Sequence, residues 1–264
     1  MDRSQSIQQQ FGPAAERYAT SSYHQTSPDL VAMLAAAALN PSQRVLDLGT
    51  GTGHTALAFA DHVGEVVGLD LTPAMLEQAR SLAEAQGVSN VRFELGDATA
   101  LPYENDCFDL VTCRVCAHHF ADPRAALREA VRVLHPNGEL LLVDSVSPED
   151  PASDTYLNCI ELIRDPSHVR NYSVRQWEAM MRDAGLAAKW LATFPTALDF
   201  EDWVERMGTP QAECAQLRAL FDRAPDRIRS ALGIRASEPY GFEIPIALFR
   251  GRCGEARDSL APRA

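Results

Sequence analysis

One stretch in the first third of the chain constrains the fold more than any other. Between Arg44 and Asp70, an apolar run ends in Asp47, three alternating glycines follow, and a second apolar run closes on Asp70. This order is typical of a short strand, a glycine turn that lets a ligand approach the backbone, and a helix from His54. Asp70 falls 19 positions after Gly51, where a carboxylate at a neighbouring strand end can accept both hydroxyls of a ribose. The pattern predicts a nucleotide pocket.

The glycine spacing narrows the choice of ligand. A dinucleotide loop follows G-x-G-x-x-G, whereas Gly49, Gly51 and Gly53 give G-x-G-x-G. No Lys or Arg stands between Arg44 and Arg80, so a pyrophosphate would find no cation in this stretch. The loop favours a ligand with a cationic amino acid end and disfavours the first alternative, an NAD-type oxidoreductase.

The chain after this loop repeats the order of strand, turn and helix. Amphipathic helix patterns alternate with further strand patterns at 65–69, 91–95, 108–113 and 139–143. Asp122 followed by Pro123 is a typical helix start. Strands that alternate with helices form a parallel sheet covered on both faces, and such sheets bind ligands at the carboxyl ends of the strands. We therefore expect an α/β, doubly wound fold.

Four motifs resemble a known family when they are taken in order and spacing. They are VLDLGTGTGHTALAFA, VVGLDLTPAMLEQAR, VRFELGDATALPYENDCFDLVTC and LREAVRVLHPNGELLLVD. Together they resemble class I S-adenosylmethionine-dependent methyltransferases, in the small-molecule branch that includes the ubiquinone and menaquinone biosynthesis enzymes. The likeness covers roughly residues 40 to 146. It implies a Rossmann-like, mostly parallel sheet of seven strands, S-adenosyl-L-methionine as cofactor, and a small-molecule methyl acceptor.

The resemblance also implies roles for single residues. Asp47, Gly49 and Gly51 would line the methionine moiety, and Asp70 and Leu71 the ribose and adenine edge. Asp97 and Ala98 would lie at the adenine amino group, and Arg114 would face the sulfonium end. The stretch YATSSYHQTSPDL, residues 18 to 30, resembles the N-terminal segment of this branch. There, Tyr18, Tyr23 and His24 would cover the cofactor. A protein that binds the cofactor but has lost catalysis is the second alternative.

The segment CRVCAHH after the fourth strand pattern has two interpretations. Its C-x-x-C pair beside two histidines is typical of zinc sites, but no second pair stands at the required distance, so we expect no metal. The resemblance places methyl transfer here, and a neutral imidazole of His118 or His119 could take a proton from an acceptor. The alternative is a histidine packed at the pocket edge.

Composition limits the function classes. The chain carries 24 basic and 36 acidic side chains and a net charge of −12, which would repel nucleic acid. Its longest apolar run, Leu30 to Leu39, is too short to span a bilayer, and its start does not resemble a signal peptide. Six irregularly spaced cysteines indicate reduced thiols. We therefore expect a cytoplasmic protein.

The C-terminal half completes the expected domain plan. Strand patterns at 186–194 and 240–250 supply the sixth and seventh strands, with Pro245 expected at the start of its strand or at a bulge. Helix patterns between them predict an inserted helical lid over 198–239 that builds the acceptor pocket. The plan is therefore an N-terminal segment (1–40), a methyltransferase domain (41–250) and a tail (251–264). The first ten residues and those from Arg252 onward are expected to be disordered.

Overall fold

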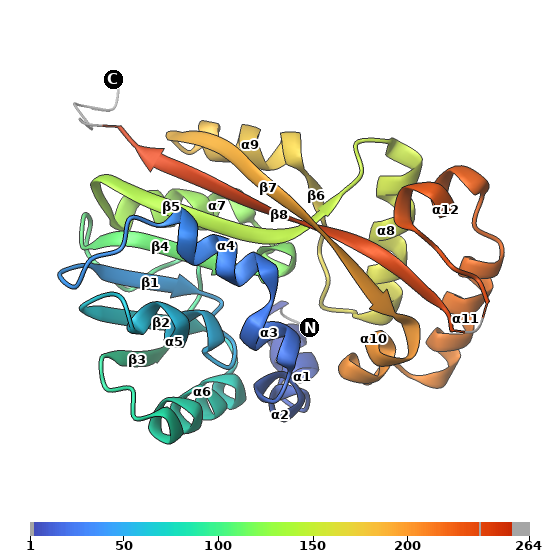
Figure 1. The fold of residues 1–264 in the computed structure, drawn as a ribbon, viewed down its shortest axis with the longest axis horizontal. Helices are drawn as coiled ribbons and strands as arrows, with labels where there is room; N and C mark the ends of the chain where they lie inside the picture. Colours follow the sequence, from blue (N-terminus) through green and yellow to red (C-terminus); the bar gives the residue numbers. More distant parts are fainter. Residues whose placement is uncertain (1–2, 238, 255–264) are drawn as a thin grey trace.

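A single twisted sheet runs through the molecule, as Figure 1 shows for the computed structural model, which describes residues 3–237 and 239–254. The strand order is β3-β2-β1-β4-β5-β8-β7, with the short β6 paired to β5. The first five strands are parallel, and β8 is antiparallel to both β5 and β7. The strands span β1 Arg44–Leu48, β2 Glu65–Asp70, β3 Val91–Leu95, β4 Phe108–Arg114, β5 Leu134–Ser147, β6 Tyr172–Ser173, β7 Leu186–Asp199 and β8 Gly241–Cys253.

Helices cover both faces of this sheet. They span α1 Arg3–Phe11, α2 Ala15–Ala19, α3 Ser22–Thr26, α4 Pro28–Ala36, α5 His54–Ala60, α6 Pro73–Gln86, α7 Pro123–Val133, α8 Pro151–Arg164, α9 Val174–Asp183, α10 Phe200–Met207, α11 Gln211–Asp222 and α12 Asp226–Leu232, with a 3-10 turn at Ala117–His119. On one face, α4, α5 and α6 pack in one buried cluster. On the other, α7 and α9 form a second cluster that includes the buried Trp177. The expected doubly wound architecture is confirmed.

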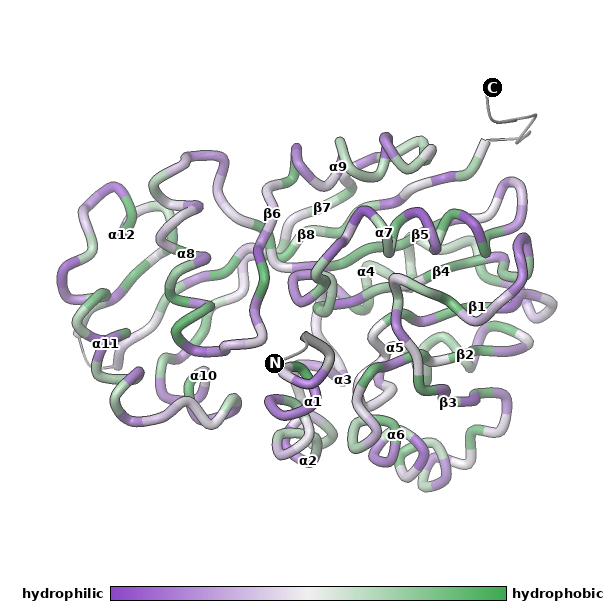
Figure 2. Tube along the Cα trace, turned by 180° about the vertical axis from the view of Figure 1, so that it is seen from behind, coloured by the Kyte–Doolittle hydropathy of each residue, from purple (hydrophilic) through white to green (hydrophobic). Residues whose placement is uncertain are grey.

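The central strands β4 and β5 contain long hydrophobic stretches (Figure 2). Val45, Leu46, Val66 and Val67 have no exposed surface, because helices pack on both faces of the parallel strands. Helix α7 begins as its sequence predicts, with the Asp122 carboxylate accepting a hydrogen bond from the backbone N–H of Ala125 at 2.9 Å. Local sequence signals therefore agree with the packing that the sheet requires.

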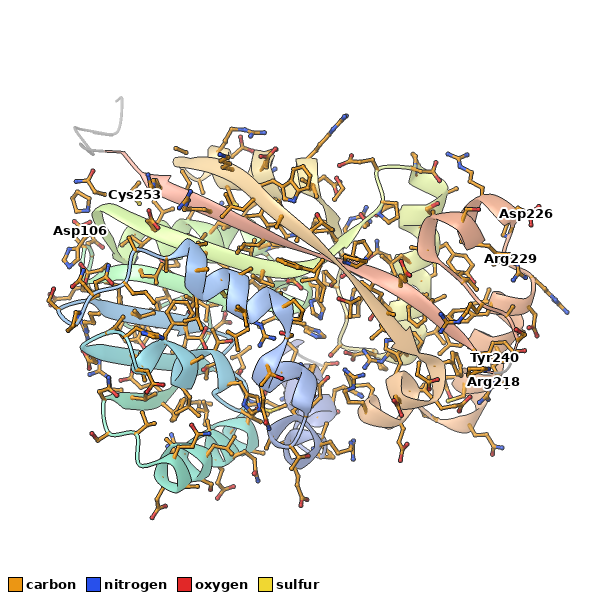
Figure 3. All side chains as sticks on the ribbon, viewed as in Figure 1. Asp106, Arg218, Asp226, Arg229, Tyr240 and Cys253 are labelled. Carbon is orange, nitrogen blue, oxygen red and sulfur yellow. The ribbon has the colours of Figure 1, made fainter. Side chains whose placement is uncertain are left out.

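A second group of helices lies beyond the far halves of β7 and β8 (Figure 1). Helices α8, α10, α11 and α12 share a third buried cluster with Phe242 and Ile244 of β8, and Trp203 lies within it. At the outer corner, the Tyr240 hydroxyl donates to the Asp222 carboxylate at 2.9 Å, and Arg229 donates to the Asp222 carbonyl oxygen at 2.6 Å (Figure 3). Within the predicted 198–239 segment, residues 200–232 thus contain three helices, and α8 joins them in one core.

Both ends of the described chain differ from the sequence expectation. Residues 3–11 form α1 and contact the rest of the protein, for example through the Gln8 side-chain amide, which donates to the Leu71 carbonyl oxygen at 2.7 Å. At the other end, β8 continues to Cys253, whose side chain is buried. The expectation of disorder is wrong for these residues, because tertiary contacts stabilise segments with weak local signals. The rest of the predicted tail, 255–264, lies outside the described residues.

Pro245 also lies elsewhere than expected, in the interior of β8 opposite Pro195 of β7. The last residue of β8 that pairs with β5 is Ile246, opposite Ser145, and Pro245 is the next residue beyond this pairing. Pro245 therefore falls where β8 has left β5, and its missing N–H removes no bond to that neighbour. The irregularity in the β7–β8 pair lies instead between Trp190 and Ala192.

Within the described residues, no helix combines the length and the apolar character needed to cross a bilayer.

Candidate functional site

A cavity opens at the carboxyl ends of the parallel strands. Its empty volume, which includes the open mouth, is about 1150 Å³. The predicted site residues that line this cavity are Tyr18, His24, Gly49, Gly51, Asp70, Leu71, Asp97, Ala98, Arg114 and His119. Asp47 and His118 lie behind this wall. The structure therefore brings most of the predicted site to one place.

The glycine loop is held through Asp70 at the end of β2. One carboxylate oxygen of Asp70 accepts from the backbone N–H of Gly51 at 2.9 Å, and the other accepts from the N–H of Thr72 at 2.8 Å. Burial raises the pKa of Asp70 despite these bonds. Each carboxylate oxygen retains a second lone pair, so Asp70 can still accept ligand hydroxyls.

Asp97 follows β3 and also lines the cavity. Its carboxylate accepts from the backbone N–H and the hydroxyl of Thr99, both at 2.8 Å. These bonds fix the turn that presents Asp97 and Ala98 to the cavity.

Asp47 lies at the carboxyl end of β1, under the glycine loop, with 1% of its surface exposed. The Thr112 hydroxyl donates to its Oδ1 at 2.7 Å. Its Oδ2 makes no bond of hydrogen-bond geometry within the described chain, although the nearby Thr50 hydroxyl lowers its pKa. Burial outweighs these contacts and raises the pKa of Asp47 to about 6.

Gly49 is required by a close approach between two loops. Its φ of +64° is a left-handed conformation, and a Cβ at this position would lie 1.9 Å from the Sγ of Cys116. Cys116 reaches this place because Val115, just after β4, has a φ of +51°, an unusual conformation for a β-branched residue. A hydrogen bond between the Cys113 and Cys116 thiols, together with burial, raises the pKa of Cys116 well above its ordinary value. Both cysteines are therefore thiols, and of the two only Cys116 lines the cavity.

Arg114, the last residue of β4, contacts the N-terminal part of the chain. Its Nε donates to the Asp29 carboxylate at 2.6 Å, its Nη2 to the Ser27 hydroxyl at 2.6 Å, and its Nη1 to the His24 carbonyl oxygen at 3.1 Å. The Arg114 and Asp29 side chains are 3% and 2% exposed, so this ion pair is buried.

The N-terminal part of the chain also lines the cavity, and its helices α1–α3 lie between the sheet and the second helical group (Figure 1). Ile7, Phe11, Tyr18 and His24 line it from this side. Burial raises the pKa of Tyr18, while burial and the Arg114 charge lower the pKa of His24 well below its usual range. The side chain of Tyr23, in α3, lies outside the described part of the structure.

Of the two adjacent histidines, His119 is the one that lines the cavity. Its Nδ1 lies 3.1 Å from the Ser167 carbonyl oxygen, which can only accept, so Nδ1 carries the proton and Nε2 is the basic nitrogen. The Phe11 ring packs edge-on against it with centroids 4.9 Å apart. Burial, followed by the positive charge of His118, lowers the pKa of His119 to about 4.

His118 points away from the cavity toward β5. Its Nδ1 lies 2.6 Å from the Asp144 carboxylate, and its backbone N–H donates to the same group at 2.8 Å. Burial alone would lower the pKa of His118, but the Asp144 charge and hydrogen bond outweigh it and raise the pKa. The two adjacent histidines therefore occupy different environments, and only His119 has contact with the cavity.

Sequence reasoning missed several residues of this site. Ile7 and Phe11 stand four positions apart in a polar segment, a spacing that is typical of one face of a helix. Asp144 interrupts the apolar run of β5 near its carboxyl end, and that break is a usable signal. Asp29 and Ser167 carry no local signal, because their partners are distant in sequence.

Residues 198–239, predicted as the lid of the acceptor pocket, contribute none of the side chains that line the cavity in the described chain. They contact its N-terminal cover instead. The Gln10 amide donates to the Met207 carbonyl oxygen and Arg17 to the Arg206 carbonyl oxygen, both at 3.1 Å. Among the described residues, no group of three or more His, Cys, Asp or Glu side chains is arranged to hold a metal ion.

Comparison with known proteins gives concordant matches. A family model described as a methyltransferase domain matches residues 39–185. The uncharacterized methyltransferase YcgJ of Bacillus subtilis is 40% identical over 91% of this chain and 96% of its own length. Its crystal structure superposes with a TM-score of 0.84 over 86% of this chain and 99% of that chain. A demethylmenaquinone methyltransferase of Deinococcus radiodurans is 39% identical over 56% of this chain and 63% of its own length.

Proposed function

Because this chain belongs to the methyltransferase domain family, we propose that it uses S-adenosyl-L-methionine to methylate a small-molecule acceptor. The observation that carries the proposal is one cavity in which Gly51, Asp70 and Asp97 come together at the carboxyl ends of β1, β2 and β3. A carboxylate acceptor for ribose hydroxyls and a second polar edge for adenine are the groups that an adenosine requires.

The amino acid end of the cofactor also finds suitable partners. The buried Asp47 carboxylate beneath the glycine loop has an oxygen without a geometric hydrogen bond in the described chain. A ligand ammonium near it would favour the charged form of Asp47 and offset its burial. Gly49 lets the loop pack directly against Cys116, since a side chain there would meet that residue.

The loop is poorly suited to a pyrophosphate, which argues against the NAD alternative. The backbone N–H groups of Thr50, Gly51 and Gly53 already donate to the Leu69 carbonyl oxygen, the Asp70 carboxylate and the Thr50 carbonyl oxygen. A dinucleotide site instead points such N–H groups at the phosphates. The comparisons likewise give no support to an oxidoreductase or to an inactive binding protein.

The reaction asks the protein mainly for alignment and exclusion of water. When bound, the cofactor supplies a methyl group already activated by its sulfonium. The N-terminal helices and the strand ends enclose the space in which donor and acceptor would meet, and enclosure favours an in-line approach. Where the acceptor must lose a proton, the Nε2 of His119 can take it, because its Nδ1 proton is held by Ser167.

Calorimetric titration with S-adenosylmethionine, S-adenosylhomocysteine and NAD tests the proposal. We expect the two adenosyl compounds to bind and NAD not to bind. Asp70→Ala should weaken S-adenosylhomocysteine by about 1.5 to 3 kcal/mol, the range for hydrogen bonds to a charged group. Asp183→Asn, at an exposed surface ion pair with Arg124, is the matched control and should bind normally. NAD binding with no adenosyl binding would overturn the proposed function, and unchanged affinity in Asp70→Ala would overturn the ribose assignment.

A further inference from the structure

The cover of the cavity is a distinct part of the chain, which we call the roof segment and define as residues 3–29. It comprises α1, α2, α3 and the start of α4. Ile7, Phe11, Tyr18 and His24 of this segment form one side of the cavity. The position of the roof segment therefore decides how well the cavity is enclosed.

Several polar contacts of the roof segment to the rest of the protein are single hydrogen bonds with a backbone oxygen as acceptor. Gln8 donates to Leu71 and Gln10 to Met207. His54, at the start of α5, lies with its Nε2 3.1 Å from the Tyr18 carbonyl oxygen. Partly exposed bonds of this kind each contribute about 0.5 to 1.5 kcal/mol. They can guide the segment but hold it weakly.

The contact with Arg114 differs from these single bonds because it contains more hydrogen bonds and is more deeply buried. One guanidinium makes three hydrogen bonds, all to the roof segment, and one of them is the buried ion pair with Asp29. Arg114 thus commits three of its five N–H donors to residues 24–29. Removing either charge would leave the other buried without its partner, which is strongly unfavourable.

The backbone beside Arg114 is shaped for this contact. Val115 adopts a φ of +51°, and its N–H donates to the Val143 carbonyl oxygen at 2.7 Å, so the chain turns sharply at the end of β4. Strand β4 lies between β1 and β5 in the centre of the sheet. Arg114 therefore projects from the end of the central strand of the sheet.

We infer that Arg114 is a positioning residue, which encloses the cofactor by anchoring the roof segment through Asp29 and Ser27 rather than by binding the sulfonium end itself. This inference rests on the proposed function for the identity of the ligand. It revises the role that the sequence resemblance implied for Arg114. The anchoring itself is a property of the free protein and can be measured without any ligand.

Asp29→Asn is the main test, because Asp29 does not line the cavity and cannot touch the ligand. The asparagine keeps the size and an acceptor oxygen but removes the negative charge, and Ser27→Ala removes a second anchor bond. In the free variants, hydrogen exchange should be faster in residues 5–26 and unchanged in β1 and β2. Asp183→Asn should change neither. Unchanged exchange in residues 5–26 in both anchor variants would overturn the inference.

Two ligands distinguish positioning from direct binding. S-adenosylhomocysteine carries the amino acid end, whereas 5′-methylthioadenosine lacks it. If Arg114 acts through the roof segment, Asp29→Asn and Arg114→Lys should each weaken the binding of both ligands by about tenfold or more. The ratio of the two ligand affinities should then stay within about twofold of the wild-type ratio. A loss confined to S-adenosylhomocysteine in Arg114→Lys, with Asp29→Asn unaffected, would show direct binding and overturn the inference. If the wild type bound neither ligand, the proposed function would fail. The hydrogen-exchange result on the free variants would still show whether Arg114 anchors the roof segment.

Discussion

His118 and His119 are neighbours in sequence with ring centroids 4.2 Å apart, yet they face different partners. His118 pairs with the buried Asp144 carboxylate, whereas His119 lies against the Ser167 carbonyl oxygen and opens to the cavity. Groups around the pair are Asp144 on β5, Glu161 and Arg164 on α8, and Asp165 and His168 in the following loop. An environment that separates two pKa values in this way is typical of acid–base sites.

Replacing His118 with Gln should raise the pKa of His119. The wild-type ring, with a pKa of about 4, is neutral at pH 7 and becomes mostly protonated only below about pH 4. The positive charge of His118 is one cause of this low value, so its removal should make His119 easier to protonate. Long-range ¹H–¹⁵N spectra of the imidazole rings across a pH series measure both states. A wild-type His119 that titrates near pH 6.5 would contradict the assignment, and Asp183→Asn is the control for general effects of mutation.

Asp47→Asn should stabilise the free protein and weaken its binding of ligand. The pKa of Asp47 is about 6 in the folded protein and 3.8 for an unperturbed aspartate. The folded state therefore binds more protons, and stability falls as the pH rises from about 4 to 6. Asparagine retains the bond from Thr112 without a charge to bury. The gain in unfolding free energy should be near zero at pH 4 and about 2 to 3 kcal/mol at pH 8.

Urea denaturation of both proteins at the two pH values measures this difference. An equal effect at pH 4 and pH 8 would show that the Asp47 charge is not the cause. Weaker binding of S-adenosylhomocysteine in the same variant would identify Asp47 as a site where stability is lost in favour of binding.

The parts of the fold that follow from short stretches of sequence were predictable. The glycine loop with Asp70, and the Asp122 start of α7, depend on residues within a few positions of one another or on a fixed spacing between adjacent strands. The alternation of strands and helices also predicted which edge of the sheet would hold the cavity, because parallel strands place their carboxyl ends together.

The roof segment was not predictable by the same means. Arg114 and Asp29 are separated by 85 positions, and His119 and Ser167 by 48, so no local pattern relates them. The polar composition of α1 indicated a disordered end, whereas its two apolar side chains, Ile7 and Phe11, are held by a cavity formed from distant segments. Tertiary contacts of this kind override weak local propensity.

Gly49→Ala should destabilise the protein by about 2 to 4 kcal/mol, from backbone strain and from overlap with a packed side chain. The new Cβ would meet the Cys116 Sγ at 1.9 Å at a φ of +64°. Gly51→Ala is a matched control, because its φ is +54° but no atom lies within 4 Å of its Cβ position. It should show the strain alone, about 1 kcal/mol.

Cys116→Ala should recover part of the loss when combined with Gly49→Ala, since it removes Sγ and leaves the Cβ contact at 2.8 Å. Equal destabilisation by Gly49→Ala and Gly51→Ala would mean that the contact with Cys116 is unimportant. Thermal or urea unfolding of Gly49→Ala, Gly51→Ala, Cys116→Ala and the double variant measures each of these effects.

The helices of the predicted lid should respond to cofactor through the roof segment. Gln10 and Arg17 bond to backbone oxygens at the end of α10, while α11 and α12 pack against α8, away from these contacts. Adding S-adenosylhomocysteine should therefore slow hydrogen exchange first in residues 45–71 and in the roof segment, and then in α10, with little change in α11 and α12.

The double variant Gln10→Ala with Arg17→Ala separates this coupling from a general tightening of the protein. It should keep the slower exchange in residues 45–71 and lose the slower exchange in α10, because only the bonds to Met207 and Arg206 have been removed. If α10, α11 and α12 all slow in the double variant, the connection does not pass through the roof segment. If the three helices exchange as slowly as the central strands in the free wild type, they form a fixed cap, because a lid must open more easily than the core.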